Sequence, residues 1–138
     1  MTAPLIVRSA ETNAIERGAG ARTVPLLGKW NADGNRVTSG ITTFEPGVGL
    51  PLHTHNVEEA VLILDGEAIV TLEDGEHRVG AGDLTWIPAG VRHRFRNAGT
   101  GPLRFYWVYG GRDVTRTLCA TGETVEHLSE HDRGTVRD

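Results

Sequence analysis

Two histidines one residue apart, His53 and His55, are the residues of this sequence whose type and spacing first suggest chemistry. In an extended strand, side chains two positions apart leave the same face, about 7 Å apart at a rise of about 3.3 Å per residue. Both imidazoles can therefore lean toward one metal ion, since metal–nitrogen bonds are about 2.1 Å long. A carboxylate, Glu58 or Glu59, follows closely, and a third histidine, His93, lies in a later segment that a barrel could bring alongside.

Three imidazoles and one carboxylate form a ligand set of intermediate hardness. Such a set suits Fe, Mn, Co, Ni, Cu or Zn. None of the candidate ligands is a cysteine, which argues against a closed structural zinc site. A six-coordinate ion with four protein ligands keeps two positions for water, substrate or dioxygen, and open positions favour catalysis. We therefore expect one divalent transition metal ion per chain, at a catalytic site.

The composition limits the kind of protein that carries these residues. The chain has 138 residues, 38% of them apolar, and a formal net charge of -4. These values fit one globular domain and argue against disorder and against general attraction to nucleic acid or anionic membranes. We therefore expect a small-molecule substrate as the partner. No stretch approaches the length of a membrane span, and the first residues do not resemble a signal peptide.

One cysteine, Cys119, is present in the chain. A single cysteine allows no intrachain disulfide, and nothing else ties the chain to an oxidising compartment. A cytoplasmic location is therefore expected.

Short β-type runs separated by glycine are the elements that must position the candidate ligands. This pattern, with 18 glycines, is typical of an all-β sandwich or barrel. Asp-Gly pairs at Asp65-Gly66 and Asp74-Gly75 are strong hairpin signals, so we expect two successive hairpins in an antiparallel meander. The expected strands are 36–44, 60–64, 68–72, 77–79, 84–87, 93–97 and 103–109.

The first part of the chain is expected to form an N-terminal arm, residues 1–28. Short strands are expected at 5–8 and 23–27, around a helical turn at 11–17. The apolar parts of this arm could supply a strand to the barrel of a partner subunit. We therefore expect a homodimer.

The barrel is expected to span residues 29–120, followed by a polar C-terminal tail, 121–138, that packs briefly and then frays. Three further histidines, His77, His127 and His131, match no metal-binding pattern. They are expected to be surface residues without a role in the site.

The sequence resembles the cupin superfamily, in particular its small members with one conserved barrel, because it matches both cupin motifs without a gap. The positions that match the first motif are Gly47, His53, His55, Glu59 and Gly66. The positions that match the second motif are Gly82, Pro88, Gly90, His93 and Asn97. Agreement at all these positions makes coincidence improbable.

The resemblance implies a fold and a ligand set. The fold is an all-β double-stranded β-helix, or jelly-roll barrel. The implied metal ligands are His53, His55, Glu59 and His93. The resemblance thus selects Glu59 over Glu58, which is then expected at the rim or on the outside.

The resemblance also implies a ranking of functions. Many small cupins are dioxygenases, so we expect an Fe(II) enzyme that cleaves or oxidises a small chelating substrate such as an enol, diketone, flavonol or catechol. The alternatives are a non-redox isomerase, cyclase or lyase with Zn, Ni or Mn, and a small-molecule-binding cupin without turnover.

Four aromatic residues are candidates to line the cavity beside the metal. Alternation along the strand places Phe95 on the same side as His93, and both faces of 103–109 carry aromatic or apolar residues, with Arg104 and Tyr109 as further options. The candidate cavity residues are Phe44, Phe95, Tyr106 and Trp107. Packing in the core is the alternative role for them.

Overall fold

The computed structural model of the chain describes residues 3–132 and 135–137. The first two residues of the expected arm, and residues 133, 134 and 138 of the expected tail, lie outside the described residues. Apart from one 3₁₀ turn, η1 (Ser9–Glu11), the regular structure of the described part consists of β-strands. No helix in this part is long and apolar enough to span a membrane.

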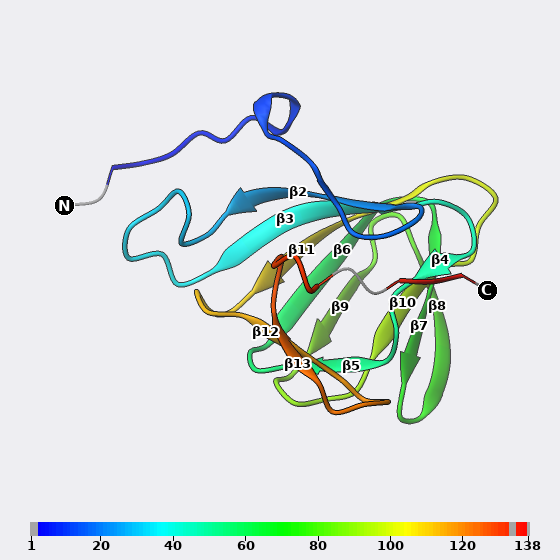
Figure 1. Ribbon diagram of the computed structural model, residues 1–138. Helices are drawn as coiled ribbons and strands as arrows, with labels where there is room; N and C mark the ends of the chain where they lie inside the picture. The colour runs from blue at the N-terminus through cyan, green and yellow to red at the C-terminus, as the bar shows by residue number, and fades with distance from the viewer. Residues whose placement is uncertain (1–2, 133–134, 138) are drawn as a thin grey trace.

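The described strands form three antiparallel sheets (Figure 1). In spatial order the largest contains β1 (Ile15–Glu16), β2 (Ala21–Leu27), β3 (Thr38–Phe44), β11 (Leu103–Tyr109), β6 (Glu59–Asp65) and β9 (Leu84–Ile87). The second contains β14 (Val136–Arg137), β4 (Val48–Gly49), β10 (Arg94–Asn97), β7 (Glu67–Leu72) and β8 (Gly75–Gly80). The third contains β13 (Thr124–Glu126), β12 (Thr115–Leu118) and β5 (His53–His55).

The barrel interior collects every second side chain of the central strands. On β11 the odd-numbered residues are buried and the even-numbered ones are only partly buried, and β6 follows the same alternation from Glu59 to Leu64. This is the period of two that a strand with one face toward a core requires. The buried core includes Phe44, Val61, Ile63, Val70, Ile87, Phe95, Leu103, Phe105, Trp107 and Tyr109.

One of the two expected hairpins is wrong. β7 and β8 pair around Asp74-Gly75 as expected. β6 and β7, on either side of Asp65-Gly66, do not pair, because β6 lies between β11 and β9 while β7 lies between β10 and β8. Gly66 has a φ of +91°, and a Cβ on it would lie 2.6 Å from the Pro102 carbonyl oxygen. Glycine therefore lets the chain cross between sheets here, and no meander forms.

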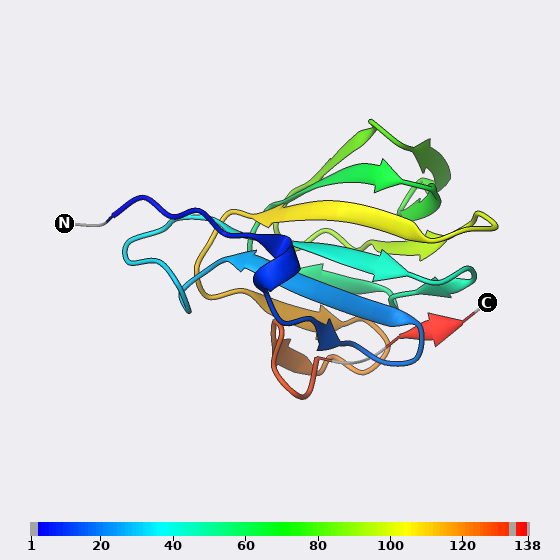
Figure 2. The ribbon, with the colours of Figure 1, turned by 90° about the horizontal axis from the view of Figure 1, so that it is seen from above.

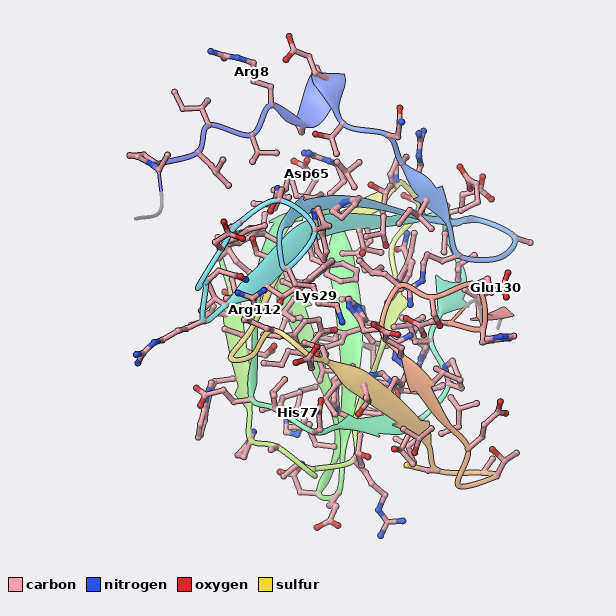
Figure 3. All side chains as sticks on the ribbon, turned by 60° about the vertical axis from the view of Figure 1, so that its left-hand side comes forward. Arg8, Lys29, Asp65, His77, Arg112 and Glu130 are labelled. Atoms are coloured by element: carbon pink, nitrogen blue, oxygen red, sulfur yellow. The ribbon has the colours of Figure 1, made fainter. Side chains whose placement is uncertain are left out.

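The N-terminal arm also differs from the expectation. β2 forms close to the expected position, but it pairs with β3 of the same chain. Residues 5–8 form no strand, and the segment expected to make a helical turn, 11–17, contains only the last residue of η1 and then β1. Figures 1 and 2 show the chain before η1 running outside the barrel, and Figure 3 shows Arg8 pointing away from it. This apolar segment has no neighbouring strand to pair with. It also packs little against the barrel, since Ile6 is 83% exposed.

The C-terminal segment packs more closely than the expected polar tail. β13 pairs with β12, and β14 pairs with β4. Between these strands Asp132 is 2% exposed, and its carboxylate binds the guanidinium groups of Arg17 and Arg116. Buried ion pairs thus join the start of the chain, β12 and the C-terminal segment.

Candidate metal centre

Four side chains from three separate parts of the chain meet inside the barrel. β5 supplies His53 and His55, and β6 begins with Glu59. His93 lies directly before β10 and forms an antiparallel bridge with His53 through two backbone hydrogen bonds of 3.1 and 3.0 Å. All four residues are buried, with at most 4% of their surface exposed.

The three imidazoles face one another closely. Their ring centroids are 4.8 Å apart for His53 and His55, 4.5 Å for His53 and His93, and 5.4 Å for His55 and His93. One ring nitrogen from each lies within 4.8 Å of the others. The Glu59 carboxylate is 3.2 Å from Nε2 of both His55 and His93. Such a three-histidine cluster is typical of a divalent metal site.

The backbone fixes which ring nitrogen of each histidine is available. In each ring Nδ1 lies within hydrogen-bond distance of a backbone carbonyl, which can only accept. Nδ1 therefore carries the proton, and the Nε2 lone pair points into the centre, as in metal-bound histidines generally. The carbonyl partners are those of Pro51 for His53 at 2.7 Å, Thr115 for His55 at 3.0 Å and Val91 for His93 at 2.9 Å.

Two buried polar atoms at the centre face each other without a donor between them. Glu59 Oε1 and His93 Nε2 are 3.2 Å apart, yet neither has a hydrogen-bond partner among the described residues. With the proton on Nδ1, both atoms are acceptors, and a cation satisfies both at once. Two ligand atoms at about 2.1 Å from one ion and at right angles are about 3.0 Å apart, so the contact distances fit a transition metal.

The ionisation states also favour a cation. Burial lowers the pKa of His53 well below its usual range, and burial likewise lowers that of His55, so both rings are neutral. Burial alone raises the pKa of Glu59, yet this pKa lies well below its usual range, so the carboxylate is ionised. An ionised carboxylate beside the neutral imidazoles of His53 and His55 is a form that binds metal without first releasing protons from these groups.

The carboxylate of Glu58, the residue before Glu59, lies outside the metal centre. Glu58 is exposed and accepts a hydrogen bond of 3.3 Å from the indole N–H of Trp86. It lies outside the barrel interior, as expected for the residue beside a buried Glu59 on an alternating strand.

Among the candidate cavity residues, Phe95 has ring contact with a centre histidine. Its ring centroid is 6.2 Å from that of His93. Phe44 and Trp107 are buried in the core, where Phe44 packs on Phe105 and Trp107 donates a hydrogen bond of 2.9 Å to Thr42.

Tyr106 does not line the barrel interior, contrary to the expectation that it is a cavity residue. It lies on the opposite face of β11 from the buried Trp107, so its side chain is on the outside of the barrel. Because both faces of β11 carry aromatic residues, alternation in the sequence did not distinguish them.

Two more residues lie beside the centre, Tyr109, which the sequence offered as a further option for the cavity, and His127. The Tyr109 hydroxyl is 3.3 Å from Nε2 of His55, and burial raises the Tyr109 pKa, so this hydroxyl keeps its proton. The ring of His127, expected on the surface, packs against Trp107 and Tyr109 with centroids 5.0 and 4.8 Å away. The burial parity of 103–109 is the signal that could have selected Tyr109, whereas no local pattern marks His127.

The third sheet places a buried cation next to the centre. Arg116 on β12 is directly opposite His55 on β5. Directly opposed residues project from the same face of a sheet. Arg116 is 3% exposed, and its guanidinium donates to Asp132 at 2.7 Å. Arg17 donates to the same carboxylate at 2.9 Å, and burial lowers its pKa to about 10.

A cavity of about 320 Å³ lies on the other side of His127. Apolar side chains form much of its wall, and its charged lining residues include Lys29 and Arg112, which are labelled in Figure 3. The apolar lining residues are Ile15, Pro25, Trp30, Val114 and Leu128. His127 thus lines this cavity and also packs against Tyr109 beside the centre.

The fold and the histidine cluster define a class, and comparison with known families agrees. Residues 40–109 match the family model described as "Cupin domain". The chain therefore belongs to the cupin family, and the barrel is a jelly roll.

Three relatives show the range of this family. The chain is 31% identical to quercetin 2,3-dioxygenase of Bacillus subtilis over 94 residues, which are 67% of this chain and 27% of the relative. It is 35% identical to dimethylsulfoniopropionate lyase DddW of Ruegeria pomeroyi over 71 residues, 51% of this chain and 45% of the relative. A structure of Bacillus subtilis oxalate decarboxylase superimposes with a TM-score of 0.71 at 25% identity, over 81% of this chain and 31% of that one. The chain thus spans less than half the length of each of these proteins.

Proposed function

We propose that the protein is a mononuclear metal-dependent enzyme in which His53, His55, Glu59 and His93 bind one divalent transition metal ion. The observation that carries this proposal is the set of three Nε2 lone pairs and one ionised carboxylate directed at one another inside the barrel. Because the backbone already orients each ring, the ligands lose little freedom on binding a metal.

The metal would supply Lewis acidity and, as Fe(II), a route for electrons from a chelating substrate to dioxygen. The protein's own groups do the remaining work. Glu59 brings one negative charge to the centre, and Tyr109 holds a proton at Oη, 3.3 Å from a ligand nitrogen. The buried aromatic side chains around them exclude bulk water, which strengthens electrostatic interactions with a bound substrate.

The reaction we rank first is oxidation or cleavage of a small chelating organic substrate by an Fe(II) dioxygenase. The likeness to a quercetin 2,3-dioxygenase over 67% of this chain supports this choice. An enol, diketone, flavonol or catechol would present two neighbouring oxygen atoms to the centre.

Non-redox chemistry is the second candidate, and a specific likeness favours it. The dimethylsulfoniopropionate lyase relative is 35% identical over 71 residues. In this case a Zn, Ni or Mn ion would polarise the substrate, and a nearby protein group would move a proton. The Tyr109 hydroxyl is placed for such a transfer.

Oxygen consumption distinguishes these candidates. Anaerobic Fe(II)-loaded protein is offered diketones, flavonols and catechols, and oxygen uptake is followed after air is admitted. We expect substrate-dependent oxygen uptake. Turnover without oxygen uptake, fastest with Zn or Ni, would favour a lyase or isomerase over the dioxygenase. A ligand that stabilises the fold but is recovered unchanged would indicate a binding protein.

A homodimer is also proposed, on the strength of an apolar outer face. The side chains of the largest sheet that point outward form two continuous apolar rows across its strands. The first row is Val24, Ile41, Tyr106, Leu62 and Leu84, and the second is Val108, Ala60 and Trp86. Leu84 and Trp86 are 65% and 60% exposed. An apolar patch of this extent favours a partner surface.

The cytoplasmic location stays a prediction from the single cysteine.

A further inference from the structure

The buried charges of the barrel interior balance only as long as the centre holds no metal. Among the described residues, the buried charged side chains other than histidine are Arg17, Arg116, Glu59 and Asp132. The two positive charges of the guanidinium groups thus balance the two negative charges of the carboxylates. A divalent cation bound at Glu59 leaves the interior with two excess positive charges, and buried excess charge is costly unless a counter-ion neutralises it.

Arg116 is the cation of this set that lies beside the centre. It is opposite His55 across the β5–β12 pair, so both side chains project from one face into the interior.

The guanidinium of Arg116 has hydrogen-bonding capacity to spare. One terminal nitrogen donates to Asp132 at 2.7 Å. The Nε–H is buried and has no hydrogen-bond partner among the described residues. Arg17 differs, because its groups donate to the Asp132 carboxylate, the Asp132 carbonyl and the Thr23 hydroxyl. An unpartnered buried N–H on a cation is a ready donor to an anionic oxygen.

We propose that Arg116 is a substrate-binding residue of the metal centre and that the substrate is a small organic anion. A carboxylate or enolate oxygen of this anion accepts a hydrogen bond from the Arg116 guanidinium while the anion neutralises the metal-loaded interior. The inference rests on the proposed function, because the excess positive charge arises when a metal ion is bound.

The experiment uses two probes of equal shape and different charge, glycolate and its neutral amide glycolamide. Isothermal titration calorimetry measures the affinity of each for cobalt-loaded protein. We expect Arg116→Met to weaken glycolate binding about tenfold or more, since a charge-assisted hydrogen bond is lost. The affinity for glycolamide should be the same in both proteins. Arg17→Met is the matched control, because it removes the other guanidinium from Asp132, and it should bind glycolate as the wild type does.

The inference is overturned if the wild type and Arg116→Met bind glycolate with equal affinity. It is also overturned if Arg17→Met loses as much glycolate affinity as Arg116→Met does, or if the cobalt-loaded wild type does not bind glycolate. If Arg116→Met does not fold, Arg116→Lys decides. Lysine keeps the charge but has no Nε–H of this geometry, so weaker glycolate binding supports the inference and wild-type affinity overturns it. Cobalt analysis of the same samples separates the two claims. A wild type that takes up no cobalt overturns the proposed function as well, whereas cobalt-loaded protein indifferent to residue 116 overturns this inference alone.

Discussion

At the scale of single residues, the centre depends on imidazoles held neutral by burial. The pKa values of His53, His55 and His127 are all lowered, with burial as the largest cause. The unfolded chain therefore binds more protons than the folded chain below the ordinary imidazole pKa of 6.5. Folding stability from these groups is complete above this pH and is lost as the pH falls below it.

The metal-free protein should accordingly become less stable on mild acidification. Between about pH 6.5 and pH 5.5 we expect a loss of about 2 kcal/mol or more, because each such histidine contributes up to about 1.4 kcal/mol per pH unit. Urea unfolding of chelator-treated protein measures this loss. A free energy of unfolding that stays constant over this range would show that the rings are not buried in their neutral form.

The two adjacent glutamates provide a matched test of the carboxylate ligand. Glu59→Gln keeps the size of the side chain but removes the charge directed at His55 and His93, so we expect metal affinity to fall about a hundredfold. Glu58→Gln alters the exposed neighbour and should bind metal as the wild type does. Competition with a coloured chelator gives both affinities. Equal affinities in the two variants would remove Glu59 from the ligand set.

At the scale of elements, one buried carboxylate adds to the strand pairing that holds the C-terminal segment to the barrel. Asp132→Ala leaves the guanidinium groups of Arg17 and Arg116 buried without their shared partner, so we expect a loss of about 3–5 kcal/mol in the free energy of unfolding. Chemical denaturation measures it. Asp113→Ala is the control, because Asp113 pairs with Lys29 at an exposed site and should cause no measurable change. Equal effects of the two substitutions would contradict a buried role for Asp132.

Strands bounded by glycine and proline could be predicted closely from the sequence. The segment expected at 103–109 is β11, and that expected at 84–87 is β9. Pairing between strands was harder, because Asp65-Gly66 marks a positive φ without saying which sheet the next strand joins. The close packing of the C-terminal segment was not predicted, for a related reason. Arg17 and Asp132 lie 115 residues apart, so no local pattern connects them.

The candidate site divides in the same way. The three clustered histidines could be recognised from their motif positions, since those positions encode a local geometry. The facing of Tyr106 could not, because both sides of β11 carry apolar or aromatic residues, although only one side lies in the core. His127 reaches the centre through the return of the C-terminal segment, which is a tertiary effect.

At the scale of the whole molecule, the proposed homodimer can be tested on the outer face of the largest sheet. If two copies pack through it, Trp86→Glu places a charge in an apolar interface and should convert the dimer into a monomer. Light scattering gives the mass. Trp30→Glu is the matched control, because Trp30 is 49% exposed but belongs to the wall of the cavity beside His127. A Trp86→Glu protein that stays dimeric would move the interface elsewhere, and deletion of residues 1–28 would then test the arm.

The most direct test of the central claim is the metal content of the purified protein, measured by elemental analysis. We expect about one first-row transition metal ion per chain in the wild type and in His131→Ala, whose imidazole is exposed, and none in His93→Ala. A wild type that holds no stoichiometric metal even after reconstitution, or a His93→Ala variant that retains it, would contradict the assignment of this cluster as a metal centre.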